Sequence, residues 1–411
     1  MDLSAVIPSL GAARATDPDG YRMNGQAPRA AVRPEDEQQV AEVLRIAGRE
    51  GLAIVPWGGG VTLSRQNAPE RYDIALDLRS IARITRFERD DFTLTAQAGA
   101  TIADLRAAVE AEGLELPLEA AESWGATLGG VLASNSSGPR RRRFGSPRDR
   151  ILGARFVTGD GVVARTGGQV VKNVAGLAVH RLLCGSHGGL SVLIESSLKL
   201  RPLATGRLAL VHAMSAAEVG ARERWNGFAR REPSALTVLG RAIAASNPAL
   251  ASDHDFCVVT VFEDDPAWIA SQESFVRERL GAPRFKVQDV SVASLLQQVT
   301  DPEELPGLRL TFTTAANTPD ALSSLSGERA AERSVFHAPA GRLHVWPEPS
   351  EAASLVTRLE SRGFTLLEAR GLEHPPDSPV SAGIQPLRAR LRAALDPART
   401  LALGDVWETR A

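Results

Sequence analysis

The sequence Gly167-Gly168-Gln169-Val170-Val171-Lys172-Asn173-Val174-Ala175-Gly176 is the most informative stretch of this chain, because it closes a series of three glycine-rich turns in one α/β half. The first turn is Pro56-Trp57-Gly58-Gly59-Gly60-Val61-Thr62, and the second is Trp124-Gly125-Ala126-Thr127-Leu128-Gly129-Gly130. Glycines where strands give way to helices let backbone N–H groups approach a phosphate closely. Two such turns can hold both ends of an extended dinucleotide, so the pattern predicts a nucleotide cofactor.

The order and spacing of these motifs resemble the FAD-binding half of the vanillyl-alcohol-oxidase type flavoproteins. Within that family, the likeness is strongest to the FAD-binding subunit of bacterial glycolate oxidase. The phrases that carry the resemblance are Ser137-Gly138-Pro139-Arg140-Arg141, Arg148-Asp149-Arg150-Ile151-Leu152-Gly153 and Gly168 to Gly176. The resemblance covers residues 30–205 and is thin elsewhere, and it implies FAD as the cofactor.

The resemblance assigns flavin contacts to all three turns. We expect the N–H groups of residues 57–62 to hold the pyrophosphate, and the small residues of the second turn to let the isoalloxazine ring lie against backbone. In relatives with covalent flavin a histidine often lies in the first loop; here Val61 stands there, so we expect noncovalent FAD. The expected cofactor-binding residues are Pro56, Trp57, Gly58, Gly59, Gly60, Val61, Thr62, Gly125, Ala126, Thr127, Gly129, Gly130, Ala133, Ser137, Gly138, Arg140, Lys172, Gly188 and Val192. Taken alone, these segments are also compatible with a plain tight turn, with helix packing through small residues and with a solvated arginine loop.

The sequence offers no evident catalytic base. Lys172, on the loop that faces the flavin in the family, and Arg309, on a predicted strand, are the two candidates: a lysine charge stabilises reduced flavin, and an arginine binds a carboxylate. Family members commonly continue after the third motif into Tyr-Asp, where this chain has Leu177-Ala178. His337 and His344 are seven residues apart, outside tight ligand spacing, so we interpret them as core or solvated histidines and predict no metal site.

Composition limits the remaining function classes. The formal net charge of −2 gives no reason to expect nucleic-acid binding, and no apolar run reaches the ~20 residues of a membrane span. The N-terminus lacks the basic segment of a signal peptide, so we expect a cytoplasmic protein, or one held at the inner face of the membrane through partners. Cys184 and Cys257 are the only cysteines, whereas an iron–sulfur cluster needs about four thiolates. A one-electron carrier would therefore belong to another chain.

Alternating strands and helices favour an α/β layer structure up to residue 205, and an antiparallel α+β pattern follows. With the resemblance, we expect an α+β fold: a two-subdomain FAD-binding domain of the vanillyl-alcohol-oxidase type, followed by a smaller antiparallel α+β cap domain. Proline, acidic residues and helical spacing start a helix after Arg33, and residues 52–55 form a buried strand that leads into the first turn. Residues 1–29 lack periodicity and are expected to be irregular, and residues 216–228 to be one helix. The expected domains are an arm at 1–29, the FAD-binding domain at 30–205 with subdomains of about 30–85 and 86–205, the cap at 206–385, and a C-terminal helix and tail at 386–411.

The last helix is followed by Asp396-Pro397-Ala398-Arg399-Thr400-Leu401. Family members usually continue there into Asn-Pro-Gly-Arg, so the family's contact between this tail and the flavin is left open.

The resemblance implies an FAD-binding subunit of a glycolate oxidase complex, which supports oxidation of a short 2-hydroxy acid to the 2-oxo acid. Its expected partners are a homologous flavin-binding catalytic subunit and an iron–sulfur subunit. Two alternatives stay open: a self-sufficient FAD-dependent 2-hydroxy-acid dehydrogenase, and a non-redox scaffold with a degenerate flavin site.

Overall fold

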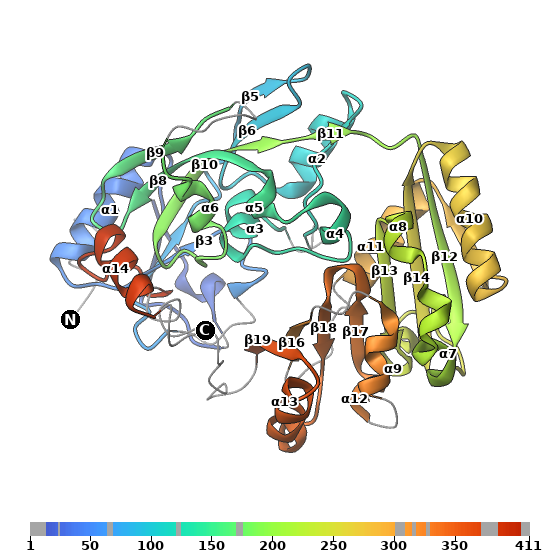
Figure 1. Ribbon diagram of the computed structural model, residues 1–411. Coiled ribbons are helices and arrows are strands. Elements are labelled where there is room, and N and C mark those ends of the chain that lie inside the picture. The colour runs from blue at the N-terminus through green and yellow to red at the C-terminus, as the bar shows by residue number, and fades with distance from the viewer. Residues whose placement is uncertain are drawn as a thin grey trace. The chain divides into compact units, whose positions relative to one another are not determined.

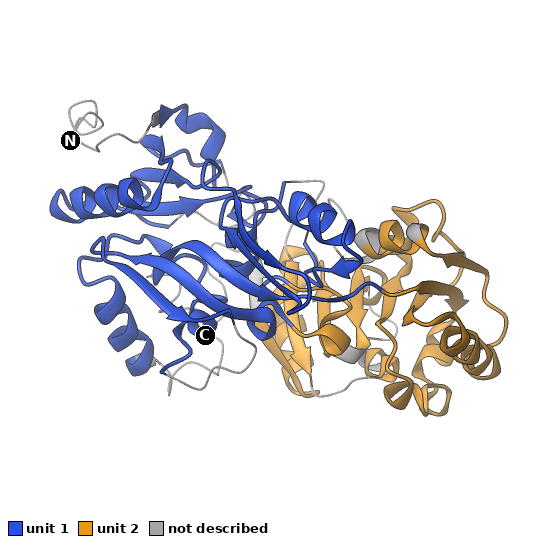
Figure 2. Cartoon of the chain, turned by 90° about the horizontal axis from the view of Figure 1, so that it is seen from above, with its two compact units in different colours: residues 1–136, 146–203, 379–411 blue, residues 137–145, 204–378 orange. Residues whose placement is uncertain are grey.

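The computed structural model describes residues 14–23, 25–63, 69–120, 125–169, 176–300, 309–314, 318–325, 329–370 and 385–403. The chain divides into two compact units, coloured separately in Figure 2. Unit 1 comprises residues 1–136, 146–203 and 379–411, and unit 2 comprises residues 137–145 and 204–378. The chain therefore enters unit 2 twice and returns to unit 1 after each of these two segments.

Unit 1 contains two larger sheets (Figure 1). The first has the order β1-β2-β4-β3, with β2, β4 and β3 parallel and β1 antiparallel to β2. The second is antiparallel, with the order β5-β6-β10-β8-β9. The strands are β1 (Arg14–Thr16), β2 (Ala30–Arg33), β3 (Ile54–Trp57), β4 (Ile74–Asp77), β5 (Ile84–Glu88), β6 (Thr93–Gln97), β8 (Ile151–Thr158), β9 (Val163–Gly167) and β10 (Ser191–Lys199), with β7 (Leu114–Glu115) and β11 (Arg201–Pro202) as a separate pair.

Helix α1 (Glu37–Arg49) begins where the sequence predicts a helix start, because the Asp36 side chain caps it by accepting the N–H of Gln39 at 2.8 Å. Its buried side chains share one core with residues of the first sheet and with Val157 and Val192 of the second sheet. The two sheets of unit 1 therefore share a core through α1. The other helices of unit 1 are η2 (Pro18–Tyr21), α2 (Ile102–Glu110), α3 (Leu128–Ser134), α5 (Pro147–Arg150), α6 (Val179–Leu183) and α14 (Gln385–Leu395).

The segment before residue 30 differs from the irregular arm that was expected. Its described part contains β1 and η2, and Tyr21 is buried with only 3% of its surface exposed. The Tyr21 ring meets the Trp57 ring edge-on at 5.5 Å, and Tyr72 donates a 2.8 Å hydrogen bond to the Tyr21 carbonyl. Contacts with residues far along the chain order this segment, which explains why local periodicity missed it.

Asp77 is completely buried at the end of β4. Its carboxylate accepts hydrogen bonds from the Tyr21 hydroxyl at 2.7 Å, from Arg33 at 2.6 Å and from the N–H of Arg79 at 3.0 Å. Burial alone would raise the pKa of Asp77, but the hydrogen bonds from Arg79 and Tyr21 outweigh it and lower that pKa below its usual value. Asp77 is paired with Trp57, so this network fixes the strand ends from which the first glycine turn leaves.

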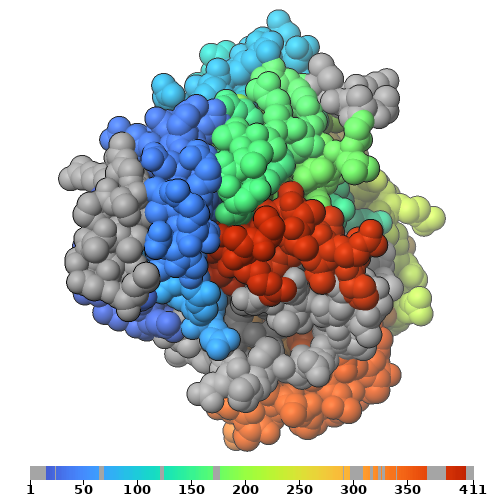
Figure 3. Space-filling view, turned by 90° about the vertical axis from the view of Figure 1, so that its left-hand side faces the viewer, coloured from blue at the N-terminus to red at the C-terminus, as the bar shows by residue number. Residues whose placement is uncertain are grey.

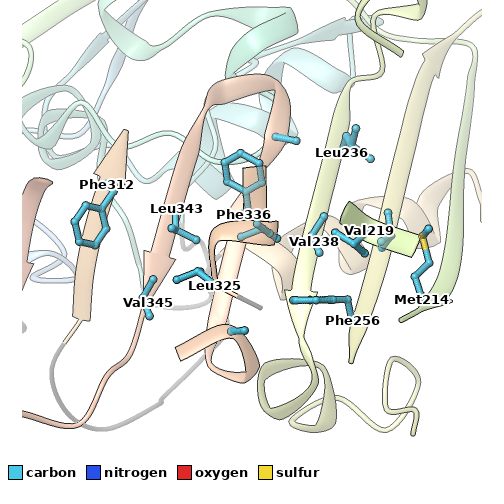
Figure 4. Packing of buried hydrophobic residues seen from close by; sticks show 14 of the residues in the cluster. Met214, Val219, Leu236, Val238, Phe256, Phe312, Leu325, Phe336, Leu343 and Val345 are labelled. Carbon is cyan, nitrogen blue, oxygen red and sulfur yellow. The ribbon is translucent and has the colours of Figure 1, made fainter. Parts of the chain in front are cut away.

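Unit 2 is built on an antiparallel eight-stranded sheet with the order β15-β12-β14-β13-β17-β18-β16-β19. The strands are β12 (Gly206–Met214), β13 (Ala235–Gly240), β14 (Phe256–Asp264), β15 (Phe285–Gln288), β16 (Arg309–Thr314), β17 (Ser334–His337), β18 (Arg342–Val345) and β19 (Phe364–Arg370). Helices α10 (Pro266–Leu280) and α13 (Ala352–Glu360) pack on one face, whose apolar core appears in Figure 4. Helices α9 (Arg241–Ala245) and α11 (Val290–Thr300) pack on the other face.

The helix predicted over residues 216–228 is interrupted in the structure. In its place the structure has the short helices α7 (Ala216–Gly220), η5 (Arg222–Trp225) and α8 (Phe228–Arg231). Gly227 adopts φ +92°, and the chain turns so that the Trp225 indole enters the core and donates a 2.8 Å hydrogen bond to the Val219 carbonyl. Burial of this large side chain thus overrides the helical spacing. The remaining short helices of unit 2 are α4 (Arg141–Phe144), α12 (Arg329–Glu332), η6 (Pro319–Leu325), η7 (Ala338–Ala340) and η8 (Pro349–Glu351).

Over the described ranges, none of the helices combines the length and the apolar character needed to cross a lipid bilayer.

We expect Asp77→Asn to lower the free energy of unfolding at neutral pH by about 1–3 kcal/mol, the usual cost of unsatisfied buried hydrogen-bonding groups. The folded pKa is depressed, so this stabilisation is present above the unfolded pKa of an aspartate and is lost as the pH falls through the folded pKa. Urea unfolding at several pH values should therefore show the two proteins converging in acid. Asp264→Asn, which removes an exposed partner of Arg143, is the control, with an expected loss below about 1 kcal/mol. Equal losses in both variants would contradict the role assigned to the Asp77 network.

Candidate cofactor site

The first glycine turn leaves the carboxyl end of β3 directly after Pro56 and Trp57. Among the described residues, the N–H groups of Gly58, Gly59, Gly60, Val61 and Thr62 donate no hydrogen bond. A run of unpaired N–H groups after a buried strand is a cradle for an anion, because these groups are obligatory donors that seek an acceptor. This geometry fits the pyrophosphate of a dinucleotide.

The second glycine turn lies in contact with the first. A Cβ added at Gly58 would lie 2.1 Å from the Thr127 hydroxyl oxygen, and one at Gly59 would lie 2.0 Å from the Gly125 carbonyl oxygen. Both distances are far below any real contact, so neither position admits a side chain while the turns stay together. The structure therefore brings together the two turns that the sequence predicted to share one ligand.

The N–H groups of the second turn divide into two groups. Those of Leu128 and Gly129 donate to the carbonyls of Ala100 and Ala98, each at 2.8 Å, and the N–H of Gly130 donates to the Thr127 hydroxyl at 3.4 Å. By contrast, those of Gly125, Ala126 and Thr127 donate no hydrogen bond within the described part of the chain. The free donors thus come from the turn before α3 rather than from the first turn of the helix.

Close packing against Ala98 is enough to explain the glycine at position 129. A Cβ there would lie 2.9 Å from the Cβ of Ala98, because α3 crosses close to β6 at this point. Ala133 also has a structural contact, because its carbonyl accepts a 2.9 Å hydrogen bond from the N–H of His187. For Gly129 the small-residue packing that competed with a flavin contact is present in the structure. Its assignment, with those of Gly130 and Ala133, stays a prediction.

Gly188, an expected cofactor contact outside the three turns, lies against the residue that precedes the first turn. This residue has φ +78°, and a Cβ on it would lie 3.2 Å from the ring of Pro56. Val192, in contrast, is a fully buried core residue of β10, paired with Val157 of β8. Only the backbone of Val192 is left to serve a cofactor.

The arginine run after Ser137 and Gly138 belongs to unit 2 and is not the solvated loop that a charge run usually is. Arg140 is 8% exposed and forms a 2.8 Å ion pair with the buried Glu263, while its guanidinium lies 4.6 Å from the ring centre of Phe144. Arg143 pairs with Asp264 at 2.7 Å. These contacts give Arg140 a structural role inside unit 2, and its flavin contact stays a prediction.

Lys172 and the neighbouring Asn173 lie outside the described residues. Leu177, which stands where the family commonly has tyrosine, is 85% exposed. Arg309 begins β16 in unit 2 and pairs in register with Arg370 of β19.

His337 and His344 lie together although seven residues separate them in sequence. The hairpin of β17 and β18 brings their ring centres to 5.6 Å, and their Nδ1 atoms lie 3.0 Å from the hydroxyls of Thr237 and Thr311 respectively. Burial, with a smaller effect of the Arg342 charge, lowers the pKa of His337 to about 3. Within the described residues no group of three His, Cys, Asp or Glu side chains is arranged for a metal ion. A turn signal at Gly341 is the feature that could have predicted this pairing.

Residues 28–167 match the family model of the FAD binding domain. This stretch contains both glycine turns and lies in unit 1 except for residues 137–145, so this part of the chain is similar to an FAD-binding domain. The prediction of FAD as cofactor is confirmed.

Within this class, the chain is similar to subunits of glycolate oxidase. Subunit GlcE of Escherichia coli (strain K12) is 41% identical over 145 residues, covering 35% of this chain and 41% of the relative. Subunit GlcD of Bacillus subtilis (strain 168) is 32% identical over 175 residues, covering 43% and 37%. D-2-hydroxyglutarate dehydrogenase of Xanthomonas citri pv. viticola is 32% identical over 173 residues, covering 42% and 37%. The matched segments span about two fifths of the length of these relatives.

Among solved structures, alkyldihydroxyacetonephosphate synthase is similar in two crystal forms. The P1 form gives a TM-score of 0.67 at 16% identity, and the P212121 form 0.65 at 17%. Each comparison covers 92% of this chain and 76% of the other. This similarity concerns the fold alone, and it confirms the expected α+β fold of the vanillyl-alcohol-oxidase type.

We expect Gly59→Val to abolish FAD binding, because its side chain would push the two glycine turns apart at the Gly125 carbonyl. The ratio of flavin absorbance to protein measures this, with circular dichroism as the check on folding. Gly20→Ala in the same unit is the matched control, since a Cβ there meets nothing within 4 Å. Full FAD occupancy in a folded Gly59→Val protein would show that the contact between the turns is not required.

Proposed function

We propose that this chain is an FAD-binding subunit of a glycolate oxidase type complex, which supports oxidation of glycolate or another short 2-hydroxy acid to the 2-oxo acid. The observation that carries the proposal is the contact between two turns whose N–H groups, at residues 58–62 and 125–127, have no acceptor in the described part of the chain. The similar proteins are named as glycolate oxidase subunits and as dehydrogenases of 2-hydroxy acids, which supports this class of substrate.

The residues present fit FAD as follows. The N–H groups of the first turn and those of Gly125 to Thr127 would hold the pyrophosphate, and the Thr62 hydroxyl would add a hydrogen bond. The side chain of Trp57 backs this loop, because a Cβ at Gly60 would lie 3.0 Å from its ring. When bound, FAD supplies the two-electron acceptor for oxidation of the substrate carbon.

The same complex requires a separate one-electron carrier. Cys184 and Cys257 are both buried, and burial raises the pKa of each thiol to about 12, so both stay protonated at neutral pH. Two cysteines are also fewer than the about four thiolates that an iron–sulfur cluster needs. We infer an iron–sulfur subunit and a homologous catalytic flavin subunit as partners, because the similar proteins include two named subunits of glycolate oxidase. We also propose a cytoplasmic location with membrane contact through those partners.

A second candidate function is a self-sufficient 2-hydroxy-acid dehydrogenase, and the histidine pair of unit 2 favours it. A neutral His337 beside His344, with Arg309 and Arg342 on adjacent strands, supplies both an imidazole and cations for a carboxylate. However, the Nε2 atom of His337 is buried and has no hydrogen-bond partner among the described residues. A substrate therefore cannot reach it as a general base. This arrangement supports the subunit proposal over the self-sufficient enzyme.

Acid precipitation should release all of the flavin into the supernatant, because Val61 occupies the position at which relatives carry a linking histidine. Absorbance of the supernatant and of the redissolved pellet measures the distribution. Flavin that remains with the pellet would contradict noncovalent binding. A protein that neither contains nor binds FAD would instead favour the third possibility, a non-redox scaffold with a degenerate flavin site.

The isolated chain should be a poor 2-hydroxy-acid dehydrogenase. When the purified protein is mixed anaerobically with glycolate or D-lactate, we expect its flavin band to bleach at least about a hundredfold more slowly than in the presence of its partner subunits, the range that general acid–base catalysis contributes. His337→Gln distinguishes the two candidates, since it should leave the slow reaction of the chain unchanged. Rapid bleaching by the chain alone, lost in His337→Gln, would establish the self-sufficient dehydrogenase.

A further inference from the structure

The segment after α14 folds around one buried carboxylate. Asp396 is completely buried, and its two oxygens accept the N–H groups of Thr400 at 2.8 Å and Leu401 at 3.0 Å. Arg392, one turn earlier and 1% exposed, places its Nε 3.7 Å from the same carboxylate and donates to the Leu401 carbonyl at 3.4 Å. Residues 396–401 therefore form a closed loop held by Asp396.

The surrounding chain leaves space for this carboxylate. A Cβ added at Gly159 would lie 2.0 Å from Oδ1 of Asp396, and the Gly159 N–H donates to the Leu395 carbonyl at 2.7 Å. Figure 3 shows the red C-terminal residues lying against blue and green residues of unit 1. The loop is therefore packed against the rest of unit 1.

This loop delivers residues 400–402 to the open edge of β3. In the first sheet β3 is the outermost strand, with β4 on its other side. The Ile54 N–H donates to the Thr400 carbonyl at 2.7 Å, and the Ala402 N–H donates to the Ile54 carbonyl at 2.9 Å. Leu401, fully buried, lies parallel to Ile54 in the same core. The tail therefore pairs with the strand that leads into the first glycine turn.

The tail also supports the side chain next to that turn. Ala402 and Leu403 pack in one core cluster with Trp57 and Tyr21. The Trp57 ring in turn lies against Gly60. A continuous line of contacts thus runs from the tail, through β3 and Trp57, to the N–H groups expected to hold the pyrophosphate.

We propose that Asp396 is a positioning residue for FAD: it folds the tail onto β3 and thereby holds Trp57 and the first glycine turn in the geometry that retains the cofactor. The proposal depends on FAD binding by unit 1 and is independent of which substrate the complex oxidises. It also gives a role to the sequence that replaces the family's usual tail phrase.

The test is the FAD dissociation constant of full-length Asp396→Asn, measured by titrating the apoprotein with FAD. The amide replaces one acceptor oxygen with a donor, so it faces one of the two N–H groups unfavourably. We expect the dissociation constant to rise at least about tenfold, together with faster hydrogen exchange of the Ile54 and Ala402 amides. Asp265→Asn is the matched control, because Asp265 also accepts two backbone N–H groups, at 2.9 and 3.0 Å, but caps α10 in unit 2. It should leave FAD affinity unchanged.

Ala402→Pro provides a second variant, because it removes the hydrogen bond to the Ile54 carbonyl and leaves Asp396 intact. It should weaken FAD binding in the same direction, and it decides the question if Asp396→Asn does not fold. Faster exchange at Ile54 with an FAD dissociation constant within about twofold of the unmodified protein would overturn the proposal. Unchanged exchange at Ile54 in both variants would equally overturn the proposal. The pairing of the tail with β3 would then depend neither on Asp396 nor on the Ala402 hydrogen bond.

Discussion

The cofactor site depends on the contact between two turns that are distant in sequence. Gly58 lies against Thr127, and Gly59 lies against the Gly125 carbonyl, in each case without room for a side chain. Because these turns meet, the N–H groups of residues 58–62 and 125–127, which donate no hydrogen bond within the described ranges, lie in one candidate site of unit 1. Other features of the unit serve this contact: the Asp77 network fixes the strand end before the first turn, and Thr127 caps the helix after the second.

Local sequence signals predict much of this arrangement. Pro34 and the acidic residues after it indicate the start of α1, and the apolar run before the first turn indicates β3. The glycine turns predict the cofactor only together with the resemblance, since alone they also fit plain tight turns and helix packing through small residues. These signals succeed because each depends on residues within one turn or one strand.

The features that sequence did not predict all depend on partners far along the chain. Tyr21 is ordered by Asp77 and Trp57, and Arg140 by Glu263, which converts an apparent solvated charge run into a buried ion pair. Trp225 breaks an expected helix because the core accepts its indole. In each case a tertiary contact outweighs the local preference.

The pairing of Leu401 with Ile54 has a consequence for synthesis of the chain on the ribosome. Translation produces β3 early and residues 396–403 only after all of unit 2. Until the tail emerges, the outer edge of β3 presents unpaired N–H and C=O groups, which is the kind of surface that invites association with other chains. The cofactor domain therefore cannot reach its final form cotranslationally in sequence order, and unit 2 has the opportunity to fold first.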